Sequence, residues 1–149
     1  MHENDTFGSF LISITKDIIR IRGVFIMYEY FNPNPKNKKV GDCVVRALCK
    51  ALNQDWKETL LQLFTYAYYM ADMPSSNAVW GSYLKSKGFT RLSIPNTCPD
   101  CYTIKDFCID HPHGTYVVGT GTHTVCVENG CYFDSWDSGD ESPVFYYRR

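Results

Sequence analysis

Residues 41–52, GDCVVRALCKAL, are the stretch that decides the fold. Apolar residues fill almost every position, and only Arg46 and Lys50 form a polar stripe, one helical turn apart. This pattern predicts a helix that is buried on nearly all sides. Asp42 is expected to be its N-cap, and Cys43 then lies in its first turn. We therefore expect the core to be built around a helix that begins at a cysteine.

The segments before this helix have a different character. Residues 31–42, FNPNPKNKKVGD, are rich in proline and asparagine and predict an irregular loop. Residues 1–26 mix apolar and charged residues without a clean period, so we expect an N-terminal extension outside the core. Residues 27–149 are then expected to form a single domain, with Met27 as an alternative start of the working protein.

Downstream, the chain predicts helices first and strands second. A helix is expected after the capping residue Asp55, with Trp56, Leu60, Leu61, Phe64 and Tyr68 at helical spacing. Two more helices are expected from about Asn77 to Gly88 and from Thr103 to about His113. Residues 115–119, 123–127, 131–135 and 144–147 are β-branched or aromatic and predict an antiparallel sheet. The predicted fold class is α+β.

Composition narrows the functional classes. The 149 residues carry a net charge of −1, which gives no electrostatic basis for binding nucleic acid or an anionic membrane. No apolar run approaches the roughly 20 residues of a membrane span. Seven cysteines, an odd number, occur mostly in apolar runs and favour reduced thiols over a disulfide framework. We expect a cytoplasmic protein.

Cys43 is the first candidate for chemistry. A cysteine in the first turn of a buried helix sits at the positive end of the helix dipole, which favours the nucleophilic thiolate. The alternative is that Cys43 is a small apolar residue that packs the start of the helix.

A histidine and an aspartate meet in the predicted C-terminal hairpin. Asn129-Gly130 predicts a two-residue type I′ turn, which pairs Glu128 with Cys131. Counting outward makes Asp134 the diagonal neighbour of His123, about 7 Å away, with His123, Val125, Asp134 and Trp136 on one face. Asp137 falls on the other face unless a bulge intervenes. Asp134 can then accept a hydrogen bond from the imidazole and fix its tautomer, although such a pair is also common on protein surfaces.

These residues give the chain a resemblance to the papain-like cysteine peptidases. A cysteine that opens a central helix, a late histidine at the start of a strand, and Asp134-Ser135-Trp136 on the next strand follow the papain order, with Asp in place of Asn. The aspartate directly before the cysteine is a feature that this chain shares with the bacteriocin leader peptidases, which it resembles in this loop. The strings GDCVVRAL, TIKDF, HPHGTYVV and YFDSWD resemble papain-like proteins of bacteriophages and mobile elements.

The resemblance implies a cysteine hydrolase that acts on a protein or peptide through a thioester. Its catalytic residues would be Cys43 as nucleophile, His123 as base and Asp134 as the residue that orients the histidine. Asn37 occupies the position of the glutamine of these enzymes, six residues before the cysteine, and would donate to the oxyanion through a shorter side chain. Trp136 would shield the contact between His123 and Asp134 from water, or would be an ordinary core tryptophan.

A second group of residues has metal-ligating character. Cys98, Cys101, Cys108 and His111 have the spacing C-x2-C-x6-C-x2-H, and these residue types bind structural zinc. The alternatives are a redox-active pair or thiols without a ligand. We expect no cofactor. A catalytically silent papain-like interaction module, stabilised by zinc at these residues, is the second functional hypothesis.

Overall fold

The computed structural model describes residues 26–149, so the expected N-terminal extension lies outside the described residues except for Ile26. The described part contains helices α2 (Cys43–Leu52), α3 (Trp56–Met70), α4 (Asn77–Ser86) and α5 (Ile104–Asp110). Its strands are β1 (Tyr28–Tyr30), β2 (Thr90–Ser93), β3 (Thr115–Gly119), β4 (Thr124–Glu128), β5 (Cys131–Asp134) and β6 (Phe145–Arg148). The predicted α+β class is confirmed. None of these helices is long and apolar enough to cross a membrane.

The strands form one sheet in the order β1-β5-β4-β3-β6-β2. The prediction of an antiparallel sheet is wrong at one edge, where β1 pairs with β5 in parallel. The prediction that helices precede strands is also incomplete, because β1 lies before α2 and β2 lies between α4 and α5. Both unexpected strands are short and pair with partners far along the chain, so they have no local hairpin signal.

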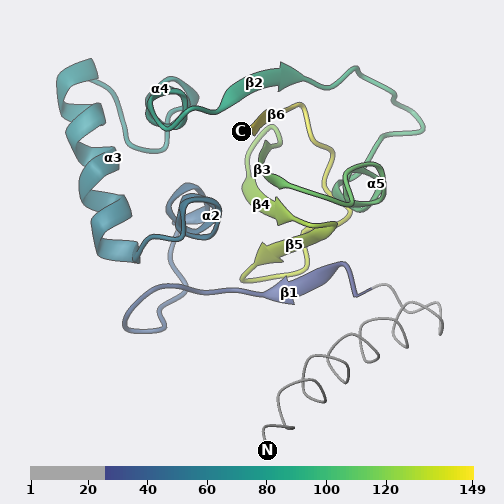
Figure 1. The fold of residues 1–149 in the computed structure, drawn as a ribbon, viewed down its shortest axis with the longest axis horizontal. Coiled ribbons are helices and arrows are strands. Elements are labelled where there is room, and N and C mark those ends of the chain that lie inside the picture. The colour runs from purple at the N-terminus through teal and green to yellow at the C-terminus, as the bar shows by residue number, and fades with distance from the viewer. Residues whose placement is uncertain (1–25) are drawn as a thin grey trace, which may run out of the picture.

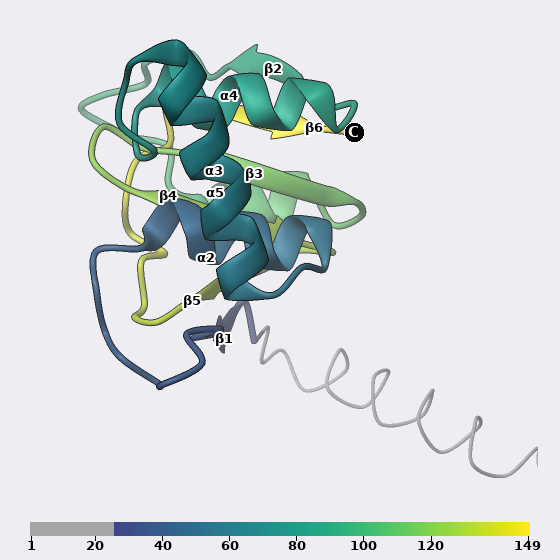
Figure 2. The same ribbon diagram turned by 90° about the vertical axis from the view of Figure 1, so that its left-hand side faces the viewer.

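Helices cover both faces of the sheet, as Figure 1 shows: α2 and α4 lie on one side and α5 on the other. The view in Figure 2 shows α2 running across the sheet, with α3 in front of it. The core beneath α2 includes the fully buried residues Leu48, Trp80 and Val117. A second core forms beneath α5 around Phe107 and Tyr132. The sheet is therefore buried on both faces, and α2 is the central buried helix that its sequence predicts.

Side chains cap the starts of three of the four described helices. The side chain of Asp55 accepts a hydrogen bond from Glu58 N at the start of α3, and Thr103 and Asp106 form a capping box on α5. Helix α5 ends at Asp110, earlier than predicted. The starts of α3 and α5 therefore follow from side-chain capping by residues that the sequence places there.

The outward face of α3 is apolar and exposed. Of the residues that predict this helix, Leu61 is 69% exposed, Phe64 52% and Tyr68 81%. The buried positions are Thr59, Leu63 and Ala67. Because α3 packs on α2 and α4 and not on the sheet, a narrow strip of side chains one turn apart is enough to bury its inner side.

Candidate active site

Cys43 is the first residue of α2 and is partly buried. Burial of the thiol raises its pKa, but the neighbouring His123, together with the Thr124 backbone and the charge of Arg46, lowers the pKa by more, so the net shift is downward. The other free cysteines of the described residues behave differently. Burial raises the pKa of Cys49 to about 11 and that of Cys108 to about 12. Cys43 is thus the thiol in this group whose surroundings favour the thiolate.

His123 is positioned by a tight turn. Its backbone N–H donates to Thr120 Oγ1 at 2.9 Å, and its carbonyl accepts from Thr120 N at 2.8 Å. The imidazole Nε2 lies 2.6 Å from Asp134 Oδ2, so Nδ1 is the ring nitrogen that remains available to Cys43. Burial lowers the pKa of His123, but the hydrogen bond to Asp134 and the negative charges of Asp134 and Cys43 outweigh burial and raise the pKa to about 9. At neutral pH the imidazole is charged and Nε2 donates to Asp134.

Asp134 ends β5 and is fully enclosed. Its Oδ2 contacts His123 and accepts from Ser138 Oγ at 2.6 Å, while its Oδ1 accepts from Arg46 and from Ser135 N. Burial raises the pKa of this carboxyl, but the hydrogen bonds from His123 and Ser138 and the charges of His123 and Arg46 together outweigh burial, and the pKa falls below the usual value. Asp134 is therefore an ionised acceptor for the imidazole.

The predicted hairpin register is confirmed where the two strands pair. Glu128 lies opposite Cys131, and Asn129 and Gly130 both have positive φ, as a type I′ turn requires. The paired region of β4 and β5 ends at Cys126 and Phe133, however, and β4 begins at Thr124, so His123 lies just outside the strand that was predicted to contain it.

Val125 was expected to share one face of the hairpin with His123 and Asp134, and this expectation is also wrong. This residue packs in the core beneath α5, whereas Asp134 reaches Arg46 of α2. His123 and Asp134 meet beyond the end of the ladder. Asp137 does not join them, because its Oδ1 accepts from Tyr132 Oη and from Gly139 N.

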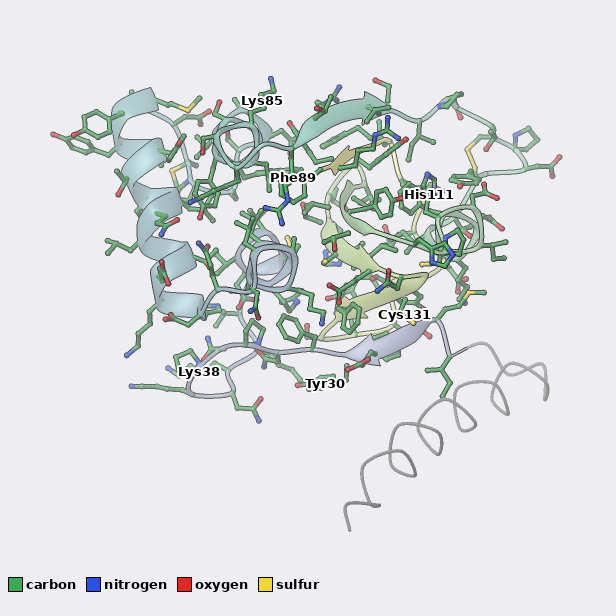
Figure 3. The ribbon with its side chains drawn as sticks, viewed as in Figure 1. Tyr30, Lys38, Lys85, Phe89, His111 and Cys131 are labelled. Atoms are coloured by element: carbon green, nitrogen blue, oxygen red, sulfur yellow. A yellow bond between two sulfur atoms is a disulfide. The ribbon has the colours of Figure 1, made fainter. Side chains whose placement is uncertain are left out.

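Trp136 and Asn37, the two other predicted site residues, differ in their contacts. The Trp136 ring lies with its centroid 5.1 Å from that of His123 and is 46% exposed, so it is not a core residue. Asn37 lies in the exposed loop between β1 and α2, which Lys38 marks in Figure 3. Its Oδ1 accepts from Asn32 Nδ2 at 3.2 Å, so its own amide hydrogens are not used in that contact. The role of Asn37 as an oxyanion donor stays a prediction.

Arg46 is a member of the site that the sequence pattern missed. It was expected on the polar stripe of α2, but its side chain is only 6% exposed and lies between Asp42 and Asp134. The prediction that Asp42 caps α2 is correct in position and wrong in chemistry, since its side chain makes no capping hydrogen bond. Its oxygens accept from Arg46 Nη1 at 2.5 Å and from Trp56 Nε1 at 2.7 Å. The burial of Arg46 depends on Asp134, which is 88 positions away in the sequence, so no local pattern indicates it.

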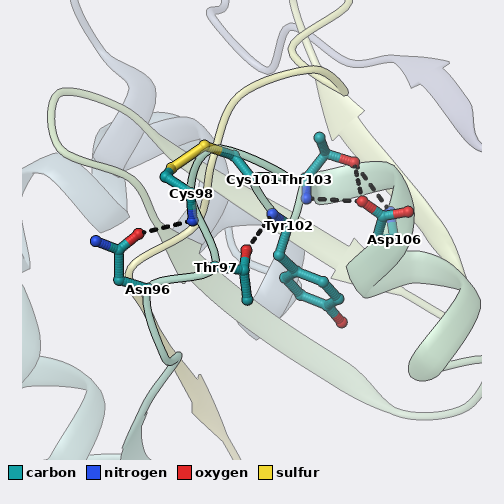
Figure 4. Close-up of a disulfide and its surroundings, with 7 residues drawn as sticks. All are labelled: Asn96, Thr97, Cys98, Cys101, Tyr102, Thr103 and Asp106. Carbon is teal, nitrogen blue, oxygen red and sulfur yellow. Dashed lines mark hydrogen bonds between the residues drawn. A yellow bond between two sulfur atoms is a disulfide. The ribbon is translucent and has the colours of Figure 1, made fainter.

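The structure does not bring the candidate zinc ligands together. Cys98 and Cys101 form a disulfide, shown in Figure 4. Cys108 is a buried free thiol, and His111 stacks on Phe107 on the α5 side of the sheet, where Figure 3 labels it. Within residues 26–149 no cluster of three or more His, Cys, Asp or Glu side chains is suited to hold a metal ion.

No protein-family model, curated protein or solved structure matches the chain at a significant level.

Proposed function

We propose that this protein is a papain-like cysteine hydrolase that cleaves a peptide, isopeptide or related amide bond. The observation that carries the proposal is the 2.6 Å contact between His123 Nε2 and Asp134 Oδ2, beside a Cys43 at the start of α2 whose pKa the neighbouring His123 lowers. A nucleophile, a base and a residue that orients the base are the three roles that acyl transfer requires. The order of the three along the chain and the central helix that begins at the cysteine also support the papain-like assignment.

The first half of the reaction acylates the enzyme. The Cys43 thiolate attacks the carbonyl carbon, and the carbonyl electrons move to oxygen. Protonated His123 gives its proton to the leaving nitrogen as the carbon–nitrogen bond breaks, which releases an amine and leaves a thioester on Cys43. In the second half, neutral His123 takes a proton from water, and the water oxygen attacks the thioester carbonyl. Release of the carboxylic acid returns the thiolate and the imidazolium, with Asp134 ionised throughout.

Backbone groups at the start of α2 are suited to hold the oxyanion. The first N–H groups of a helix have no partner within it. The side chain of Asp42 does not cap α2, so it does not compete for these donors. Negative charge that develops beside Cys43 would also be favoured by the helix dipole. The side-chain amide of Asn37 would be a second donor.

Acylation by an activated ester tests this proposal without knowledge of the natural substrate. The protein is mixed with p-nitrophenyl acetate at neutral pH, and release of nitrophenol is followed together with the mass of each cysteine-containing peptide. We expect a rapid burst and an acetyl group on Cys43, and neither with Cys43→Ser. His123→Ala should slow the burst greatly. Acetylation spread evenly over Cys43, Cys49 and Cys131 would sink the proposal.

The same experiment separates the enzyme from the silent interaction module. A folded protein whose Cys43 is not acylated, and is no more reactive toward iodoacetamide than buried thiols, would favour the module. If Cys43 is acylated, digestion of a peptide library by wild type and by Cys43→Ser identifies the bond that the enzyme cleaves, as the bond cut only by wild type.

A further inference from the structure

Arg46 is a buried cation held between two carboxylates from distant parts of the chain. Its side chain is 6% exposed, that of Asp42 5% and that of Asp134 1%. Asp42 directly precedes the proposed nucleophile, and Asp134 is the proposed partner of His123. A charge this well enclosed persists only when its partners satisfy it, and a buried ion pair is by itself weak evidence for stability. The contacts on each carboxylate show what else Arg46 does.

On Asp134, Arg46 fixes the direction of the carboxylate. Arg46 Nε and Nη2 both donate to Oδ1, at 3.1 and 2.8 Å, and Ser135 N donates to the same oxygen at 2.7 Å. The other oxygen, Oδ2, is left for His123 and Ser138. Two donors in the rigid guanidinium plane restrict rotation of the acceptor more than a single ammonium can. The imidazole therefore meets an oxygen whose position is fixed from the far side.

On Asp42, Arg46 holds a carboxylate away from the nucleophile. Asp55, Ser76 and Thr103 each accept a backbone hydrogen bond at the start of their helices, as N-cap side chains usually do. Asp42 occupies the same position on α2 and does not. Its oxygens are bound instead by Arg46 and Trp56. The first turn around Cys43 thus keeps its free N–H groups and has no carboxylate capping it.

We infer that Arg46 is a positioning residue that holds Asp134 toward His123 and Asp42 away from the N-terminus of the Cys43 helix. The inference rests on the proposed function, and it adds a residue that acts through its neighbours without touching the substrate. Loss of Arg46 would free Asp42 to cap α2, which would place a negative charge beside the thiolate and occupy the donors proposed for the oxyanion. It would also let the Asp134 carboxylate rotate.

The electrostatic consequences point the same way. His123 is the main group that lowers the pKa of Cys43 against the effect of burial, and the charge of Arg46 adds to it. Arg46 also helps to keep the pKa of Asp134 low, behind the hydrogen bonds from His123 and Ser138. The charged groups around the thiol are therefore His123 and Arg46, with Asp134 and Asp42 behind them. A neutral residue at position 46 should therefore raise the pKa of Cys43 and that of Asp134.

The pH dependence of Cys43 alkylation tests the inference. The rate of iodoacetamide labelling at Cys43 is measured by peptide mass from pH 5 to pH 9 in wild type, Arg46→Lys, Arg46→Met and Arg46→Met/Asp42→Ala, each shown to be folded by its melting curve. We expect the midpoint of Arg46→Met to rise by about one pH unit, which slows labelling below the midpoint about tenfold. Arg46→Lys keeps the positive charge but lacks the planar guanidinium, so its midpoint should lie between those of wild type and Arg46→Met. Removal of Asp42 in the Arg46→Met background should bring the midpoint back toward wild type.

Trp56→Phe keeps Arg46 and removes only the second donor to Asp42, so it provides the test if Arg46→Met does not fold. It should raise the midpoint by less than Arg46→Met. A folded Arg46→Met with the wild-type profile, or an unchanged profile in Trp56→Phe when Arg46→Met is unfolded, would overturn the inference and leave the proposed function standing. A wild-type Cys43 that labels no faster than Cys49 at pH 6.5 would reject the proposed function, and the inference with it.

Discussion

His123 Nε2 lies 2.6 Å from Asp134 Oδ2 at the open end of the paired region of β4 and β5, with side chains 10% and 1% exposed. The contact is made by a turn residue and by the last residue of a strand, not by neighbours within the sheet. The end of a sheet leaves room for a third group, and the N-terminus of α2 brings Cys43 there. The arrangement depends on Asp134 being ionised, which leads to the first prediction.

Asp134→Asn should slow alkylation of Cys43 at neutral pH at least about tenfold, because loss of the carboxylate lowers the pKa of His123 by about one unit or more. Asp137→Asn is the matched control, since its carboxylate bonds to Tyr132 and Gly139 and not to the imidazole. We expect the control to change the rate less than about twofold. The reverse ranking would show that Asp137 is the partner of His123 in solution.

Trp136→Ala should make the reactivity of Cys43 sensitive to salt. The indole ring packs against the imidazole, and its removal exposes the ion pair of His123 and Asp134 to water and to screening ions. We expect labelling at pH 6.5 to slow several-fold between low salt and about 1 M salt in this variant, and to change little in wild type. Tyr68→Ala, which removes an aromatic ring that is 81% exposed on α3, should behave as wild type. Equal salt dependence in all three proteins would remove the shielding role of Trp136.

Local signals in the sequence predicted the elements that local chemistry determines. Asn129-Gly130 predicted the turn and register of the last hairpin, and Asp55 and Thr103 marked the starts of α3 and α5. These features depend on residues within a few positions of one another. The expected contact between His123 and Asp134 followed from the register, although the geometry that makes it differs from the one expected.

Features set by distant partners could not be predicted in the same way. Arg46 looks like part of a solvated stripe until Asp134 is placed beside it. Strand β1 has no hairpin partner, because it pairs with β5 in parallel. The exposed side of α3 could not be distinguished from its buried side, since this depends on where α2 and α4 pack. Each of these required the tertiary arrangement, not the pattern of the segment itself.

The same substitution on two helices tests the assignment of buried and exposed faces. Leu48→Ala removes a fully buried side chain from α2 and should lower the free energy of unfolding by about 3 kcal/mol through the cavity it leaves. Leu61→Ala, on the outward face of α3, should change it by less than about 0.5 kcal/mol. Urea denaturation followed by circular dichroism measures both. A large loss at Leu61 would mean that the outer face of α3 is covered in solution.

The last prediction concerns the pH dependence of stability, in which His123 and Cys43 act in opposite directions. The pKa of His123 is raised from 6.5 to about 9, so its contribution to stability is complete below pH 6.5 and is lost as the pH rises toward 9. The pKa of Cys43 is lowered from 9.0, so its contribution is complete above pH 9.0 and is lost as the pH falls through its folded value.

Between pH 6.5 and about pH 9, wherever Cys43 is ionised in the folded protein, the folded pair holds one proton on His123 and the unfolded pair holds one on Cys43. The two contributions then cancel, and this pair gives wild type no slope. Cys43→Ser removes the thiol and leaves His123 beside Asp134, so the folded state binds one proton more than the unfolded state. The free energy of unfolding of the variant, relative to wild type, should therefore fall with rising pH above 6.5, by at most about 1.4 kcal/mol per pH unit. Urea denaturation of both proteins at pH 6.5, 7.5 and 8.5 measures the difference, and Cys43→Ser/His123→Ala should abolish the slope. Parallel curves for wild type and Cys43→Ser would mean that Cys43 and His123 do not share a proton in the folded protein.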